Sequence, residues 1–303
     1  ATDGAAAVDP GERRALRLTS VFAASAFPGW QPHPEVWLLV AAIIGFGFYA
    51  SRVIQPNAVA AGGAPITAAQ RRWVALGVAR LGVASVWPLL VFAEERLYSA
   101  HMLQHMILTV VMPPVFLLAT PDWLARFILG HGAVDRWFRK LARPIPAAVG
   151  YNVLAALGHW TGIVNLAVEN GPFHYLMHTL FVLTAFFIWT PVFGPLQELH
   201  VSPPVKMVYI FLMSVVPTIP AAFLTASDSP IYTAYDHGPR LWGISVVGDQ
   251  QFAGAVMKVI EGAYLWAIIL YMLLKWLGAG SEKRADPYRG TLVPSGAPSP
   301  TDD

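Results

Sequence analysis

The sequence predicts an all-α, polytopic membrane protein built as a transmembrane bundle of about seven helices. Three observations predict this class. The 303-residue chain is 55% hydrophobic and only 13% charged, whereas a soluble domain carries about 25% charged residues. The charges gather in short connections and in two polar tails, between long apolar runs. No run alternates apolar and polar residues over a strand-length segment, so the pattern does not predict a β-barrel.

Seven stretches are long and apolar enough to cross a membrane, because about 20 residues at a rise of 1.5 Å each span a hydrocarbon core of roughly 30 Å. We therefore expect a transmembrane domain at 36–276, preceded by an N-terminal tail at 1–35. Residues 277–303 are rich in proline, glycine, serine and charge, a composition that predicts a disordered tail. The seven stretches are residues 36–54, 73–92, 98–119, 147–168, 173–193, 205–225 and 250–276.

Prolines interrupt several of these stretches. Proline has no N–H to donate to the carbonyl four residues earlier, so it kinks or breaks a helix unless neighbouring groups satisfy that carbonyl. We expect bends or breaks at Pro88, Pro113, Pro114, Pro217 and Pro220.

The distribution of Lys and Arg predicts the orientation, because cytoplasmic loops carry an excess of basic residues. With the N-terminus outside, thirteen Lys and Arg residues fall on the inner side and five on the outer side, while Arg80 and Lys258 fall within helices. The sequence therefore predicts an external N-terminus and a cytoplasmic C-terminus. Residues 13–26 have a basic start and a short apolar stretch, and so resemble the remnant of a targeting segment.

The candidate metal ligands are histidines, because the sequence contains no cysteine, which excludes disulfides and thiolate metal sites. His101 and His105 open the third stretch, and His174 and His178 open the fifth. Both stretches enter the membrane from outside, so the predicted orientation places all four histidines at one level of the outer leaflet. His159 lies in the second half of the fourth stretch, which runs outward, and reaches a similar level.

Each pair is spaced to present two imidazoles to one point, because residues four apart share a helix face with Cβ atoms about 5 to 6 Å apart. Imidazole binds copper, zinc, iron and nickel, and thioether favours reduced copper. A lone histidine such as His159 is more simply an interhelical hydrogen-bonding group. Two pairs at one level favour a functional site, since polar residues in lipid are costly. Met102, Met106 and Met177 lie near the pairs, although each alone is more simply a packing residue.

The last stretch carries ionisable residues of two kinds. Asp249 begins it, level with the histidines and near the positive end of the helix dipole, so we count it as a candidate ligand. Lys258 and Glu261 lie three residues apart inside the stretch, and we interpret them as an ion pair that offsets part of the cost of each charge. Glu94 and Glu95 end the second stretch at the histidine level and are interpreted as solvated loop charges.

Three segments resemble a known family. They are HMLQHMILTVVMPPVFLLATP at 101–121, FHYLMHTLFVLTAFFIWTPVFGP at 173–195 and DQQFAGAVMK at 249–258. These segments are similar to the CtaG family of bacterial cytochrome c oxidase assembly factors. The resemblance covers residues 36–276 and leaves both tails outside. Lys258 departs from the family pattern, in which tryptophan is frequent at this position, and this departure leaves the subfamily and the client oxidase open.

The resemblance implies a non-catalytic, multi-pass protein of the bacterial plasma membrane. It implies that the protein binds copper, as Cu(I), at the outer face and passes it to the copper centre of a haem-copper cytochrome c oxidase. The implied partners are an oxidase subunit, membrane lipid and a copper donor protein at the outer face, with no nucleic acid. The ligands that we expect are His101, His105, His174, His178 and Asp249, with His159 as their neighbour.

The residues alone leave three alternatives open. A haem b electron carrier would use histidines of separate helices as axial ligands, although pairs four residues apart crowd one side of such a site. An ion or proton transporter would use Lys258, Glu261 and the histidines as a relay. A structural subunit of a respiratory complex would hold no metal. The sequence contains no phosphate-binding loop and no HExxH motif, so it gives no support for an enzyme.

Overall fold

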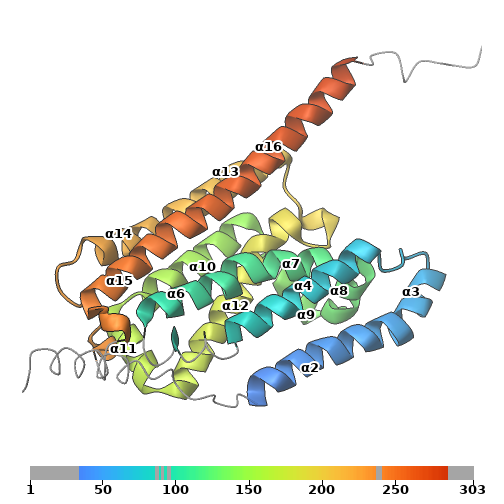
Figure 1. The fold of residues 1–303 in the computed structure, drawn as a ribbon. Coiled ribbons are helices and arrows are strands. Elements are labelled where there is room, and N and C mark those ends of the chain that lie inside the picture. The colour runs from blue at the N-terminus through green and yellow to red at the C-terminus, as the bar shows by residue number, and fades with distance from the viewer. Residues whose placement is uncertain (1–33, 86–88, 90–91, 94–96, 237–240, 286–303) are drawn as a thin grey trace, which may run out of the picture.

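The protein is a bundle of helices that run side by side, as the computed structural model in Figure 1 shows. The structure describes residues 34–85, 89, 92–93, 97–236 and 241–285. Within these residues there are helices and no strand, which confirms the predicted all-α class. Five of the described helices are long and apolar enough to cross a membrane: Val36–Ala60, Tyr98–Ala119, Gly171–Phe193, Pro203–Ala226 and Val246–Gly278. The chain is a polytopic membrane protein, and the predicted number of about seven spans is approximate.

The first span stands at the side of the bundle. It is continuous through α2 (Pro34–Tyr49), the π-helical turn η1 (Ala50–Ile54) and α3 (Gln55–Ala60), and most of its large side chains are exposed. It packs on α4 (Ala68–Ser85). This helix forms the first part of the predicted span 73–92, but it carries Arg71, Arg72 and Arg80 and is not among the five long apolar helices. Pro88 lies outside the described residues.

The third predicted span forms the centre of the bundle and has the predicted bounds. It consists of α6 (Tyr98–Met106), the π-helical turn η2 (Ile107–Val111) and α7 (Met112–Ala119), and it is the most buried of the five long apolar helices. It packs against α4 and against α12 (Gly171–Phe193).

The central helix stays continuous at Pro113 because a neighbouring helix supplies the missing donor. In a regular helix the Thr109 carbonyl accepts from the N–H of residue 113, which proline lacks. The indole Nε1 of Trp189 in α12 donates to this carbonyl instead, at 3.1 Å. Proline is tolerated inside membrane helices when a neighbouring helix donates a hydrogen bond to the carbonyl that proline leaves without a partner. The bends expected at Pro113 and Pro114 therefore take the form of a π-helical turn rather than a break.

The prediction of one helix over 147–168 is wrong. The segment forms α10 (Pro144–Gly158) and α11 (Thr161–Glu169), and Trp160 between them has extended backbone with φ −70° and ψ 127°. Gly158 lies so close to Phe181 of α12 that a Cβ atom would come within 2.7 Å of the ring. The His159 side chain bonds the carbonyl of Ala155 at 2.8 Å. The helical hydrogen bond from the His159 N–H to the same carbonyl, at 3.1 Å, is still formed. The extended backbone of Trp160 then interrupts the helical hydrogen bonding, so the chain turns here and His159 lies just beyond α10.

The last two spans form an antiparallel pair along one side of the bundle (Figure 1). α13 (Pro203–Val215) and α14 (Thr218–Ala226) are separated by a break at Val216 and Pro217, as the prolines predicted. α15 (Val246–Ala255), the π-helical turn η6 (Val256–Ile260) and α16 (Glu261–Ala285) are continuous, so the last helix passes its predicted end at 276. Residues 286–303 of the predicted disordered tail lie outside the described residues.

The predicted ion pair between Lys258 and Glu261 is not formed. Lys258 is exposed and its Nζ donates to Thr218 Oγ1 at 2.6 Å, while Glu261 lines the internal cavity described below. The physical reason is the π-helical turn η6, which holds Lys258 and ends before Glu261. A π turn changes the rotation per residue, so residues three apart across it no longer share one face as they do in an α-helix.

Candidate metal centre

Four histidines from two neighbouring helices meet near one end of the bundle. His105 and His178 have ring centroids 4.4 Å apart. His101 lies 5.3 Å from His174 and 5.4 Å from His178 by the same measure. His101 and His105 stand three and seven residues after the first residue of α6. His174 and His178 stand three and seven residues after the first residue of α12. Because these two helices begin at the same end of the bundle, the structure brings all four predicted residues together.

Three of the histidines converge closely enough to share one ion. The ligand nitrogens of His101, His105 and His178 all lie within 4.8 Å of one another. His174 joins them through its Nε2, which is 2.7 Å from Nε2 of His178. Two imidazoles at about 2.0 to 2.1 Å from one tetrahedral ion stand about 3.3 Å apart. An ion could therefore replace this hydrogen bond after only a small movement of the two rings.

His159 contributes a fifth imidazole to the same space. Its Nδ1 lies 2.8 Å from the Ala155 carbonyl, which can only accept, so Nδ1 is the protonated nitrogen and Nε2 carries a lone pair. Within the described part of the chain, Nε2 of His159 and Nδ1 of His101 are buried and have no hydrogen-bond partner. Buried polar atoms of this kind are rare and call for a ligand, an ion or water. Both nitrogens fit a metal-binding role.

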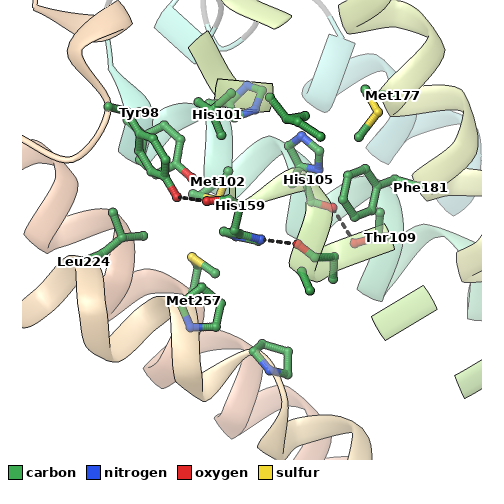
Figure 2. A pocket seen from close by; sticks show the side chains of 18 of the residues that line it. Tyr98, His101, Met102, His105, Thr109, His159, Met177, Phe181, Leu224 and Met257 are labelled. Atoms are coloured by element: carbon green, nitrogen blue, oxygen red, sulfur yellow. Dashed lines mark hydrogen bonds between the residues drawn. The ribbon is translucent and has the colours of Figure 1, made fainter. Parts of the chain in front are cut away.

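The histidines line a cavity of about 420 Å³ (Figure 2). Among the described lining residues, Glu261 is the one acidic side chain, and there is no Lys or Arg. The ligand atoms of the wall are therefore mainly uncharged. Thioethers come from α6, α12 and η6, and tyrosines also line the wall. These wall residues are Met102, Met106, Met177, Met257, Tyr98, Tyr151, Tyr232 and Tyr235.

Asp249 holds the helix that carries the first histidine pair. Its carboxylate accepts from the backbone N–H of Tyr98 at 2.6 Å and of Ser99 at 3.2 Å, and from the Ser99 hydroxyl at 2.5 Å. The first N–H groups of a helix have no partner within it, so Asp249, 5% exposed, caps α6 from α15. The group of converging ligand nitrogens does not include it. The structure thus gives Asp249 a positioning contact and does not bring it into the histidine cluster.

Aromatic side chains fix the histidine rings, and the sequence analysis missed them. Phe181 stands edge-on to His105 at 5.2 Å between centroids, and Tyr98 stacks on His101 at 5.9 Å. A signal was present, because Tyr98 precedes His101 by three residues and Phe181 follows His178 by three, a spacing that places side chains on one helix face. Tyr232 and Tyr235 pack on Tyr98 from a connection far along the chain, which no local pattern indicates.

The two other histidines that the structure describes lie elsewhere. His131 and His200 lie in connections at the opposite end of the bundle, and Nε2 of His200 bonds the Gly194 carbonyl at 2.6 Å. Glu94 and Glu95 lie outside the described residues. The fit of the site to a metal therefore rests on the five imidazoles of the cavity.

The fold and this site define a class: a polytopic membrane protein with a histidine cluster in a cavity near one membrane boundary. A family model described as cytochrome c oxidase caa3 assembly factor (Caa3_CtaG) matches residues 47–279. The chain belongs to this family, which confirms the resemblance found in its histidine-bearing segments. No curated protein and no solved structure matches the chain significantly.

Proposed function

We propose that this protein binds one copper ion, as Cu(I), through His101, His105, His174 and His178 and passes it to the copper centre of a cytochrome c oxidase during assembly. Membership of an oxidase assembly family supports the role. The observation that carries the proposal is the convergence of histidine ligand nitrogens from two helices within 4.8 Å. In this proposal copper is cargo and the protein is not a catalyst.

The chemistry of the donors favours reduced copper. The cavity offers imidazoles and thioethers, and these are the ligands that soft Cu(I) accepts in the absence of thiolate. Neutral donors leave the full charge of the ion in a weakly polar space, and the cost of burying an ion rises steeply with its charge. A monovalent ion is therefore the better match for this wall than a divalent one.

The arrangement also suits release of the ion. A donor that must hand over its metal needs an empty state that is itself stable. Here the hydrogen bond of 2.7 Å between His174 and His178 satisfies two ring nitrogens as soon as copper leaves. Because this bond replaces part of the lost coordination, removal of the ion does not leave both imidazoles without a partner.

The orientation and partners complete the proposal. The excess of Lys and Arg in the connections at the opposite end supports an orientation with the histidine end outside and the C-terminus in the cytoplasm. Copper would then arrive from a donor protein at the outer face of a bacterial plasma membrane. The receiving partner is a subunit of the haem-copper oxidase, embedded in the same lipid.

The geometry supports a haem-carrying role less well. Two axial imidazoles must face each other across the iron with the flat macrocycle between them. The rings of His105 and His178, by contrast, lie 4.4 Å apart in direct contact, and the nitrogens of His174 and His178 bond each other. A Soret absorption band in proportion to the purified protein would reverse this preference.

Metal analysis of detergent-purified protein tests the proposal. The wild type, loaded with Cu(I) and freed of excess metal, should hold one copper ion per chain. His105→Ala and His178→Ala should lose it. His131→Ala is the matched control, since this histidine is exposed in the connection between two short helices far from the cavity, and it should bind as the wild type does. Undiminished copper in both site variants would overturn the assignment.

A physiological test separates delivery from storage. Cells without this protein should make the oxidase subunits but show low oxidase activity when copper is scarce, and a plasmid-borne wild-type copy should restore the activity. A copy with His105→Ala should not. Normal activity at limiting copper in cells without the protein would contradict a delivery role.

A further inference from the structure

The cavity is much larger than a copper site requires. It measures about 420 Å³, whereas a water molecule takes about 30 Å³ of the liquid and a bare ion takes less. The four clustered histidines line one part of it. Another part of the wall is apolar and comes from helices that carry no histidine ligand: Ile163 and Val164 on α11, and Ile219, Pro220 and Phe223 on α14. We call this part of the wall the apolar half; its side chains carry no atom that binds a metal.

The apolar half opens on the outer surface of the bundle. Ile219 and Phe223 line the cavity and yet are 61% and 70% exposed, and Ala156 of α10 is likewise both lining and exposed. The two walls belong to different helix pairs, because α14 packs on α15 whereas α11 packs on α12. We call this opening, bordered by Ala156, Ile219 and Phe223, the lateral opening.

The lateral opening lies at the depth of the histidines. Phe223 and Ile219 stand three and seven residues before the end of their span at Ala226. His101 and His105 stand three and seven residues after the start of theirs at Tyr98. In each span, three residues correspond to about 5 Å and seven residues to about 10 Å along the helix axis. The opening therefore faces the hydrocarbon region of the membrane rather than the water beyond it.

Two helix breaks border this space. Gly158 and His159 line the cavity where α10 ends, and Val216 and Pro217 line it where α13 ends. Of the two, only the first departs from helical backbone, at the extended Trp160, and non-helical backbone at membrane depth is tolerated where it faces a cavity. The cavity therefore lies beside both interruptions, between α10 and α11 on one side and α14 on the other.

We propose that the lateral opening is the docking site for a transmembrane helix of the client oxidase, which inserts one copper-binding side chain from within the membrane. The inference rests on the proposed copper-delivery function. A segment that arrives at this depth must be apolar outside and must satisfy its own backbone, which requires a helix. In this arrangement the helix lies against the exposed Ile219 and Phe223 and directs one imidazole or thioether into the cavity that the histidines line.

The transfer step conserves charge and electrons. Copper exchanges its bonds to the cluster for bonds to the incoming side chain and its neighbours and remains Cu(I) throughout. While His174 and His178 bind copper through Nε2, each neutral ring carries its proton on Nδ1. When the ion leaves, one of the two rings returns to the tautomer protonated at Nε2, and the hydrogen bond between them forms again. No oxidant or reductant is needed.

Photocrosslinking tests the docking site directly. A benzoylphenylalanine at position 223, in membranes that contain the assembling oxidase, should give an adduct with an oxidase subunit. The same residue at position 252 is the matched control, because Phe252 is also largely exposed, at 61%, and lies outside the cavity wall. Adducts with lipid alone from position 223, or equal oxidase adducts from both positions, would overturn the inference.

Narrowing the opening separates docking from copper binding. Ala156→Phe should leave one copper ion per chain but reduce oxidase copper to the level found without the protein. Ala263→Phe, at an exposed position of α16 away from the cavity, should leave both unchanged. A fully copper-loaded oxidase in the presence of Ala156→Phe would overturn the docking site and leave the delivery function standing. Failure of the wild type to bind copper would instead overturn the function on which the inference rests.

Discussion

The two ends of the bundle handle polar groups in opposite ways. At the histidine end, His101, Gln104 and Asp249 are buried. Other imidazole rings surround His101, Gln104 donates to the Ala84 carbonyl, and Asp249 accepts from Tyr98 and Ser99. At the opposite end, Glu198 bridges Arg126 and Arg139 at 3.0 Å each, and these side chains are between 31% and 48% exposed. Water can replace a lost partner only at the second end. We therefore expect single substitutions to matter far more at the histidine end.

Removal of the cap on α6 should have the largest effect. Asp249→Ala leaves the N–H groups of Tyr98 and Ser99 and the Ser99 hydroxyl without their acceptor. An unsatisfied buried group costs about 1 to 3 kcal/mol, so the variant should lose about 3 kcal/mol of stability and bind copper weakly. Thermal unfolding in detergent measures the loss. For Asp228→Ala, at an exposed loop position, the free energy of unfolding should stay within about 0.5 kcal/mol of the wild-type value. Equal losses of stability in the two variants would contradict the capping role of Asp249.

The close approach of α14 and α15 behind the cavity should be the next most sensitive point. A Cβ atom on Gly254 would lie 2.6 Å from the Ala221 carbonyl oxygen, which is backbone and cannot move aside. Gly254→Ala should therefore cost about 2 kcal/mol, as overpacking typically does. Gly262→Ala in the same continuous helix meets nothing within 4 Å and should be neutral or slightly stabilising because alanine favours helix. Unfolding of both variants at the wild-type temperature would contradict the close approach of Gly254 to the Ala221 carbonyl.

Midway between the two ends, the indole of Trp189 should show an intermediate effect. Trp189→Phe keeps an aromatic ring but removes the donor to the Thr109 carbonyl, next to Pro113. One unsatisfied buried carbonyl should cost about 1 to 2 kcal/mol. Trp266→Phe, at a side chain that is 54% exposed, serves as the control and should unfold as the wild type does. A larger loss from Trp266→Phe would contradict the assigned role of the indole hydrogen bond.

The charged end should give the smallest effect, and one that depends on pH. A backbone hydrogen bond to Glu198 and the guanidinium groups of Arg139 and Arg126 hold the pKa of this carboxyl below its usual value. Its stabilising contribution is therefore present above a pH of about 4.3 and is lost as the pH falls further. Glu198→Gln should cost less than about 1 kcal/mol at pH 7, and the difference from wild type should vanish near pH 3.

The matched control for this charge is Glu169→Gln, at an exposed position at the end of α11. At pH 7 and at pH 3, this variant should unfold at the same temperature as the wild type does at that pH. A difference between Glu198→Gln and wild type that grew as the pH fell would have the wrong sign for a salt-bridged carboxylate and would refute the bridge.

Particular elements show how far sequence reasoning reached. The bounds of the third span were correct, because a long apolar run ends where polar residues begin, and that transition is local. The fourth stretch looked equally continuous, yet its helix ends at Gly158, which lies close to Phe181 of another helix, and Trp160 takes an extended backbone. Lys258 and Glu261 appeared paired on an ideal helix, and a π-helical turn separated them. Each error came from a contact or a helical irregularity that hydrophobicity does not encode.

The candidate site divides in the same way. Residue spacing determined that each histidine pair shares one helix face, and hydropathy placed both pairs near a membrane boundary. Only the tertiary structure decided that the span containing α6 packs on α12, that the histidine rings of the two helices meet, that Asp249 caps α6, and that an apolar half-cavity with a lateral opening lies beside the cluster. The physical reason is range: helix periodicity and lipid burial act within about 20 residues of chain, whereas the cap joins segments 151 residues apart.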